Sequence, residues 1–413
     1  MKTLSPLLFT LLWSSCAISQ SCNEDSIVIK SIRASDTDPN ITWEAKQHIV
    51  LHNPTCNSKN TLVINLIGTD PFGTMPLTNF LTFPSVAANN GFHVISIKYK
   101  NNDSEAIKCA NSGDIECYEN YHIENLYGQD SLSSINIDTS ECILNRIEKL
   151  LQYLSSNYPS ESWNQFLSGD NVNWSEVIVA GHSQGGSHAA FIAHEFTIKR
   201  ALLFASPFEY NNNFLSTAPW VSTFSQTPDS NLYAFSNLYD EVSQFQRQYL
   251  AWSSLGIINH GDTVNVDAST YPYENTRLLY TKDTSTIGTS FSAMHGSVYT
   301  DSLTFYDGFG VPIYKPVWEY MLGIDNSPSI IGESINSPFD FRIFPNPANS
   351  YLYFESSCKI KLIQISNLLG EICFAKLINT STGRIDISAL NNGYYTVLVN
   401  GESGFKIEKL VIK

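Results

Sequence analysis

The sequence predicts an α/β fold, a mostly parallel central sheet flanked by helices, followed by a small all-β sandwich. Between residues 48 and 324, short runs rich in β-branched residues alternate with helical patterns. Several runs are nearly continuous apolar stretches, which is typical of strands buried on both faces of a sheet. After residue 339 the helical patterns stop, and short alternating strands separated by turn residues follow.

The composition predicts a globular protein. The chain has 413 residues, of which 43 % are hydrophobic and 15 % charged, so it is long enough for one large domain and a smaller one. Its formal net charge of −15 repels phosphate backbones, and no basic stripe or basic amphipathic helix is present. We therefore predict neither a nucleic-acid partner nor membrane-surface binding, and no transmembrane segment.

The first residues predict export. Residues 1–19 combine Lys2, an apolar run too short to span a bilayer and the small residues Ala17 and Ser19, so we expect a signal peptide cleaved after Ser19. Export permits disulfides, and the seven cysteines that remain leave at least one unpaired. Cys109 and Cys117 are close enough in sequence to pair, although sequence does not determine connectivity. No CxxC pair or HExxH helix is present, so no metal site or cofactor is predicted.

The elements of the large domain follow from local patterns. A helix is predicted from Ser140, where apolar side chains recur at helical spacing over residues 140–156. Long segments at 101–138 and 208–229 interrupt the alternation of strands and helices. The aromatic residues of the second segment either line a ligand site or pack beneath the loops. The predicted strands are 47–53, 61–68, 92–99, 176–181, 199–206, 231–237 and 276–282.

One stretch of the chain carries the strongest chemical signal. In "VIVAGHSQGGSHAAFIAH" (177–194) an apolar strand runs into a serine placed between glycines, and a helical pattern follows. So tight a turn forces strained backbone angles on Ser183 and leaves room only for glycine two positions away, at Gly181 and Gly185. The turn lifts the Ser183 hydroxyl to the carboxyl edge of the sheet, where it can act as a nucleophile.

A serine nucleophile needs a histidine base and a carboxylate that orients the base. Only His260 and His295 follow the helix after Ser183, and His295 is the one that follows the last predicted strand of the large domain. The histidines within the turn and its helix are expected to pack or to face solvent. Asp240, just past the strand at 231–237, is the predicted acid, and the alternatives left open are Asp229, Glu241, Asp262 and Asp267.

The oxyanion of a tetrahedral intermediate needs two backbone N–H donors. One is expected from Gln184, the residue after the nucleophile. The other is expected from Thr69, at the end of the strand 61–68, although Gly68 in that loop could simply make a turn.

At these motifs the chain resembles the α/β-hydrolase superfamily. The resemblance covers residues 48–324 and lies in "LIGT" (66–69), "GHSQGG" (181–186), "YDE" (239–241) and "MHGSVYTD" (294–301). It implies a serine hydrolase with Ser183 as nucleophile, Asp240 as acid and His295 as base, without a cofactor. The HGGG oxyanion loop is absent, so the second oxyanion donor and the substrate class stay open.

The tail resembles the C-terminal sorting domain of the type IX secretion system of Bacteroidetes. The resemblance lies in "FPNPANSYL" (344–352), "ISNLLGE" (365–371), "IDISALNNGYYTV" (385–397) and the terminal "FKIEKLVIK". It implies recognition by the type IX machinery, passage across the outer membrane and a secreted or cell-surface protein. An ordinary carbohydrate-binding or adhesive module is the alternative.

Together these patterns predict a signal peptide (1–19), a catalytic domain (20–324), a linker (325–338) and a sorting domain (339–413). The predicted function is a secreted serine hydrolase that cleaves carboxylic esters. The alternatives are a non-catalytic binding or adhesion protein on the same scaffold, and a peptidase or acyltransferase that uses the same three residues.

Overall fold

The computed structural model describes residues 22–43, 47–284, 292–308, 310–325, 340–367, 372–401 and 404–413. The chain separates into two compact units, Met1–Pro328 and Ser329–Lys413, each of which is considered by itself. The predicted signal peptide lies outside the described residues, and so does the predicted linker apart from Asp325.

The first unit is built on a mixed sheet whose strand order is β1-β2-β4-β3-β7-β8-β11-β13-β12. Strand β2 is antiparallel to both of its neighbours, and the remaining neighbours pair in parallel. The strands are β1 (Val28–Ile32), β2 (His48–His52), β3 (Leu62–Leu66), β4 (His93–Ile97), β7 (Val177–His182), β8 (Arg200–Phe204), β11 (Leu232–Asn237), β12 (Val264–Asn265) and β13 (Leu278–Thr281).

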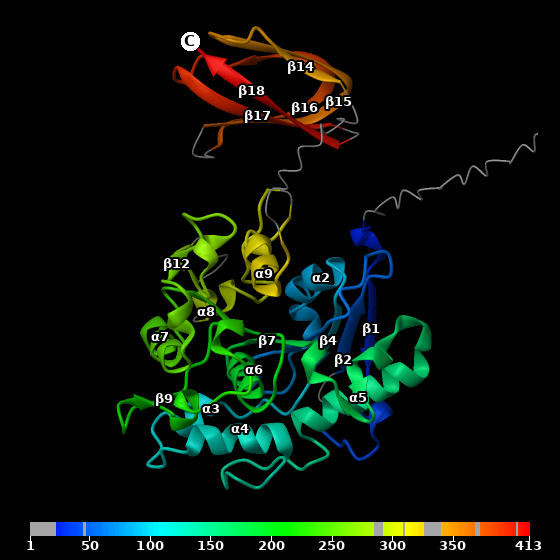
Figure 1. The fold of residues 1–413 in the computed structure, drawn as a ribbon, viewed down its shortest axis with the longest axis vertical. Helices are drawn as coiled ribbons and strands as arrows, with labels where there is room; N and C mark the ends of the chain where they lie inside the picture. The colour runs from blue at the N-terminus through cyan, green and yellow to red at the C-terminus, as the bar shows by residue number, and fades with distance from the viewer. Residues whose placement is uncertain are drawn as a thin grey trace, which may run out of the picture. The chain divides into compact units, whose positions relative to one another are not determined.

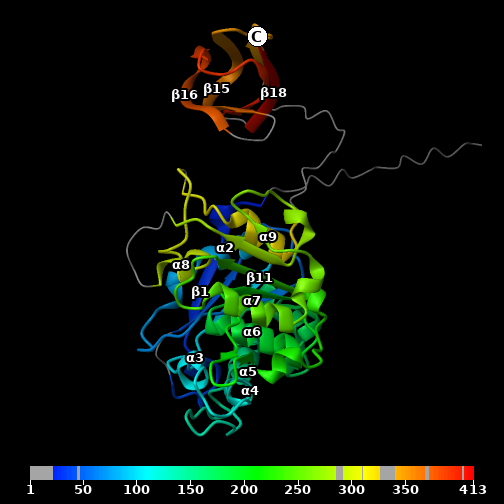
Figure 2. The same cartoon turned by 90° about the vertical axis from the view of Figure 1, so that its left-hand side faces the viewer.

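Helices cover both faces of this sheet (Figures 1 and 2). On one face, α2 (Thr82–Asn89) and α9 (Lys315–Leu322) enclose an apolar core with Phe83 and Trp318. On the other, α4 (Cys117–Tyr127), α5 (Ile143–Asn157), α6 (Gln184–Glu195) and α7 (Phe245–Ser254) enclose a second core with Ile147 and Trp252. The short helices are α1 (Ala34–Thr37), α3 (Glu105–Cys109) and α8 (Ala293–Ser297).

All seven predicted strands and the helix predicted from Ser140 are present, the helix as α5. Strands β1 and β12 were not predicted. Strand β1 lies at the sheet edge and is only partly buried, so it carries no continuous apolar run. Strand β12 contains two residues, too few to produce a pattern.

The two long segments that interrupt the alternation pack against each other. The first contains α3 and α4, joined by the Cys109–Cys117 disulfide whose pairing the sequence left open. The second contains the hairpin of β9 (Tyr210–Asn211) and β10 (Ser216–Thr217), and the Asn211 side chain donates to the Cys109 carbonyl at 3.0 Å. A second disulfide, Cys22–Cys56, was not predicted, and β5 (Leu167–Ser168) pairs with β6 (Asn171–Val172) in another small hairpin.

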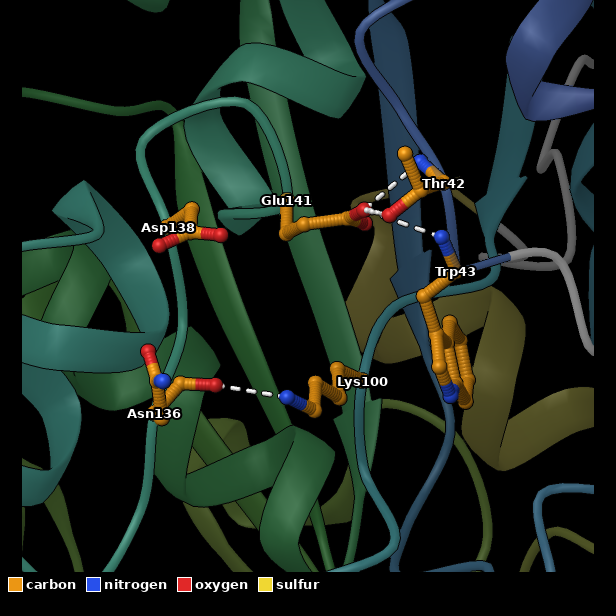
Figure 3. A pocket seen from close by; sticks show the side chains of 6 residues that line it. All are labelled: Thr42, Trp43, Lys100, Asn136, Asp138 and Glu141. Atoms are coloured by element: carbon orange, nitrogen blue, oxygen red, sulfur yellow. Dashed lines mark hydrogen bonds between the residues drawn. The ribbon is translucent and has the colours of Figure 1, made fainter.

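Glu141, just before α5, fastens the segment between α1 and β2 to the rest of the unit. Its carboxylate accepts hydrogen bonds from the Thr42 N–H (2.7 Å), the Thr42 hydroxyl (2.9 Å) and the Trp43 N–H (2.9 Å). These groups line a pocket of about 270 Å³ that also contains Asp138, with Lys100 bonded to the Asn136 carbonyl on the opposite side (Figure 3). Glu141 also forms a buried ion pair with Arg146.

The hydrogen bonds and the ion pair of the Glu141 carboxylate predict a contribution to stability that depends on pH. Burial raises the pKa of Glu141, but hydrogen bonds from Trp43 and Thr42 and the Arg146 charge outweigh it and hold that pKa below its ordinary value. The stabilisation by the ionised Glu141 carboxylate is therefore complete above the pKa of the unfolded chain, about 4.3. It is lost as the pH falls through the lower pKa of the folded protein. We expect Glu141→Gln to reduce the free energy of unfolding by about 3 kcal/mol at neutral pH, and by less in acid.

Urea unfolding followed by tryptophan fluorescence measures this effect, because the six tryptophans that follow the predicted signal peptide all precede residue 319 and report on the first unit. Glu176→Gln is the matched control, because it removes an ion pair with Lys199 that is more than a third exposed. It should cost no more than about 1 kcal/mol. Equal losses in both variants, or a Glu141→Gln loss independent of pH, would contradict the prediction.

The second unit is one antiparallel sheet curled around its own core, which includes Leu352, Ile363 and Val397. It therefore differs from the predicted sandwich of short strands. Strand β15 pairs with β16 along most of its length and also with β14 near its start and with β17 near its end. Register shifts after Glu355 let this long strand bend. The strands are β14 (Phe341–Phe344), β15 (Tyr351–Asn367), β16 (Ile372–Asp386), β17 (Gly393–Gly401) and β18 (Gly404–Ile412).

Candidate active site

Ser183 sits in a strained turn between β7 and α6. Strand β7 ends at His182 and α6 begins at Gln184, which leaves Ser183 alone between them. Its backbone angles are φ 56° and ψ −128°, a region that residues with side chains rarely occupy. Its N–H donates to the Phe204 carbonyl of the neighbouring strand at 2.9 Å. The turn thus places the hydroxyl at the carboxyl edge of the sheet, as the motif predicted.

The glycines of this turn are required by close packing. A Cβ on Gly181 would lie 2.1 Å from the Gly185 carbonyl oxygen, and one on Gly185 would lie 2.2 Å from the Leu66 carbonyl oxygen. Both contacts are with backbone atoms, which cannot rotate away. Any other residue at these two positions would push α6 away from β3 and β7 and displace Ser183.

The structure brings His295 and Asp240 together. His295 lies on α8, and its Nδ1 is 2.8 Å from Oδ2 of Asp240, which follows β11. Both residues are buried. Because the carboxylate accepts the Nδ1 proton, Nε2 of the neutral ring carries a lone pair and can accept a proton from a hydroxyl.

The Asp240 carboxylate is held on both of its oxygens. Oδ1 accepts from the N–H groups of Val242 (2.9 Å) and Ser243 (2.7 Å), and Oδ2 accepts from Gln248 Nε2 (3.0 Å) as well as from His295. Gln248 is a fully buried residue of α7 that also bonds Ser236 and the Ser243 carbonyl. The sequence analysis missed Gln248, since nothing distinguishes a buried glutamine in a helical pattern from a surface one.

Two further residues hold the backbone of α8 around His295. The Glu241 carboxylate accepts from the N–H groups of Met294 (3.1 Å) and His295 (3.2 Å). His182 Nε2 lies 2.9 Å from the His295 carbonyl oxygen. Burial, with the nearby His295, lowers the pKa of His182 to about 3, so the ring stays neutral and Nε2–H is the donor. In the sequence, Glu241 directly follows Asp240 and His182 directly precedes Ser183. This adjacency was the sequence signal that could have indicated that both residues support the site.

The structure shows no hydrogen bond between the alternative acids and the His295 ring among the described residues, and the alternative base, His260, is paired with another carboxylate. His260 is bonded to Asp229 at 2.7 Å, while Asp262 is exposed. Asp267 accepts from the Thr281 hydroxyl and the Lys282 N–H. Glu241 contacts the backbone of His295 and not its ring. Among the described residues, Asp240 is the carboxylate that bonds the His295 imidazole.

Ser183 and His295 line one pocket of about 590 Å³, together with the predicted oxyanion residues Thr69 and Gln184. The Thr69 hydroxyl donates to Gln184 Oε1 at 2.7 Å, so these two residues are in contact. A Cβ on Gly68 would lie 2.8 Å from the Ser183 Cβ, so Gly68 allows the loop after β3 to approach the serine. Much of the remaining wall is apolar and includes Met75, Phe80, Ile107, Phe208, Val242 and Leu303.

Comparisons with known proteins identify the tail. Residues 342–413 match the family described as "Secretion system C-terminal sorting domain". This confirms the predicted sorting domain, and the chain is therefore exported through type IX secretion to the cell surface or the medium. No curated protein matches the chain. No helix within the described ranges is long and apolar enough to cross a membrane.

Two solved structures show distant likeness. A DUF3244 family protein with an immunoglobulin-like β-sandwich fold from Bacteroides vulgatus is 16 % identical, with a TM-score of 0.16, and the match covers 18 % of this chain and 94 % of that one. A "Putative Dienelactone Hydrolase" from Klebsiella pneumoniae is 9 % identical, with a TM-score of 0.34, over 62 % of this chain and 86 % of that one. At these TM-scores neither likeness assigns a function.

Proposed function

We propose that this chain is a secreted serine hydrolase of the α/β-hydrolase superfamily that cleaves carboxylic esters through an acyl-enzyme on Ser183. The observation that carries the proposal is the His295–Asp240 hydrogen bond, because His295 lines the same pocket as the strained Ser183. The strand order supports it, because the serine follows the central parallel strand β7 and the acid and base follow β11 and β13 in turn.

The proposed reaction uses these groups in sequence. His295 Nε2 takes the Ser183 proton as the hydroxyl oxygen attacks the ester carbonyl, and Asp240 stabilises the resulting imidazolium. The backbone N–H groups of Gln184, at the start of α6, and of Thr69 stabilise the oxyanion. The imidazolium then protonates the leaving alcohol, and water attacks the acyl-enzyme with His295 again acting as base. The apolar wall favours an ester with an apolar acyl group.

In this proposal the domain at 20–324 carries the chemistry and the domain at 339–413 directs export. The sorting function and the hydrolytic function then depend on separate groups of residues.

Labelling with a fluorophosphonate probe tests the proposal directly, since the probe reacts with an activated serine and not with an ordinary one. We expect the folded chain to be modified on the peptide that contains Ser183, as mapped by mass spectrometry, and the heat-denatured chain to remain unmodified. A folded chain that stays unlabelled, or that is labelled on a different serine, would favour a non-catalytic binding protein on the same scaffold.

A further inference from the structure

A buried cluster of acidic and imidazole side chains lies where the two long segments meet α6. Glu105 comes from α3, His122 from α4, and Glu209 from the segment between β8 and β9. Their relative exposures are 3 %, 0 % and 0 %. His188, on the helix that follows Ser183, is 1 % exposed and adjoins His122. The catalytic proposal uses none of these side chains.

The donor atoms of the cluster converge on a small volume. His122 Nε2 lies 2.9 Å from Glu209 Oε1 and 3.8 Å from Glu105 Oε2, and one donor atom from each of the three residues lies within 4.8 Å of the others. Ligands about 2.1 Å from a tetrahedral ion lie about 3.4 Å apart, so these separations need only small adjustments around an ion.

The negative charge of the cluster has little compensation. Within the described part of the chain, no lysine or arginine forms an ion pair with Glu105 or Glu209. Trp220 Nε1 donates to Glu209 Oε2 at 3.0 Å, but Glu105 Oε2 has no hydrogen-bond partner apart from the adjoining Ser187 hydroxyl. Burial and the nearby Glu209 charge raise the pKa of Glu105 well above its ordinary value, so either a proton or a cation compensates the charge of these two carboxyl groups.

We propose that Glu105, His122 and Glu209 bind one divalent transition-metal ion of the zinc class. One imidazole nitrogen and two carboxylate oxygens suit such an ion, whereas calcium and magnesium require more oxygen ligands than the cluster provides. His188 completes the arrangement, because its Nδ1 lies 3.0 Å from Nδ1 of His122. With His122 Nε2 on the ion, its Nδ1–H donates to His188 and fixes the orientation of the ring.

The position of the cluster indicates a structural role next to the pocket. Glu105 lines the 590 Å³ pocket, which offers the ion a route from solvent, and its N–H donates to Gln184 Oε1 at 3.4 Å. An ion here would join α3, α4 and the segment before β9 to each other, beside the helix that follows Ser183. The expectation of no metal rested on local motifs, which cannot detect ligands contributed by three separate segments.

Metal analysis of the purified full chain tests the proposal and does not depend on esterase activity. The protein is dialysed against a chelator, incubated with excess Zn²⁺ or Co²⁺, desalted and analysed by mass spectrometry. We expect about one ion per chain, a visible Co²⁺ spectrum of the four-coordinate type and a higher thermal unfolding midpoint with the ion than without it.

Glu105→Gln should lower the retained metal at least about tenfold, because it removes a charged ligand and changes little else. The matched control His260→Gln removes a half-buried histidine–carboxylate pair outside the cluster and should still bind one ion. Equal metal content in Glu105→Gln and the wild type would overturn the proposal. If Glu105→Gln fails to fold, the wild type decides alone, because no retained Zn²⁺ and no Co²⁺ spectrum would show that protons, and not a metal, occupy the cluster.

Discussion

Ser183→Ala should lower kcat for short p-nitrophenyl esters about a millionfold while leaving the fold intact. The substitution removes the only atom proposed to form the acyl-enzyme and adds no volume to a half-buried position. Residual turnover above the uncatalysed rate is expected, since the oxyanion donors and the pocket remain. Initial rates across a series of acyl-chain lengths would measure the loss and also define the preferred substrate.

Ser156→Ala, an exposed serine on α5, is the matched control and should keep wild-type activity. Circular dichroism should show the same folded state for both variants. If Ser183→Ala retained more than about a hundredth of the wild-type kcat, Ser183 would not be the nucleophile.

Asp240→Asn should lower kcat about ten-thousandfold with little change in KM. The asparagine amide can donate to His295 Nδ1, and it would then hold the imidazole in the tautomer whose Nε2 already carries a proton. That ring cannot accept the Ser183 proton. The loss would reside in the chemical step, so the amount of acyl-enzyme formed in a rapid-mixing burst should fall with kcat.

Asp267→Asn tests whether the effect is specific. Asp267 was one of the alternative acids, and its carboxylate bonds the Thr281 hydroxyl and the Lys282 N–H, away from the His295 ring. It should keep kcat within a few-fold of the wild type. A large loss of kcat in Asp267→Asn combined with a near-normal kcat in Asp240→Asn would show that Asp267, and not Asp240, is the acid that supports His295.

Much of the first unit could be predicted because its central strands are buried on both faces. Leu62–Leu66 and Val177–His182 are buried throughout and therefore appear as apolar runs in the sequence. The turn at Ser183 was equally visible, because its two close backbone approaches admit only glycine. Asp240 follows the predicted strand 231–237, and His295 follows the last predicted strand of the large domain. This order along the chain predicted that the two side chains would be in contact.

The supporting contacts could not be predicted, because they depend on side chains brought together by the fold. Gln248 reaches Asp240 from α7, and His182 bonds the carbonyl of a residue 113 positions later. The Glu105–His122–Glu209 cluster likewise joins three segments with no common motif. In the second unit, turn residues indicated short strands, whereas bulges let β15 continue and bend into one curled sheet.

The described residues that line the 590 Å³ pocket all lie between Gly68 and Leu303, within the first unit. The sequence that matches the sorting family begins at residue 342, within the second unit. A cut in the chain between the two units would therefore leave every described wall of the pocket on one fragment and the export sequence on the other.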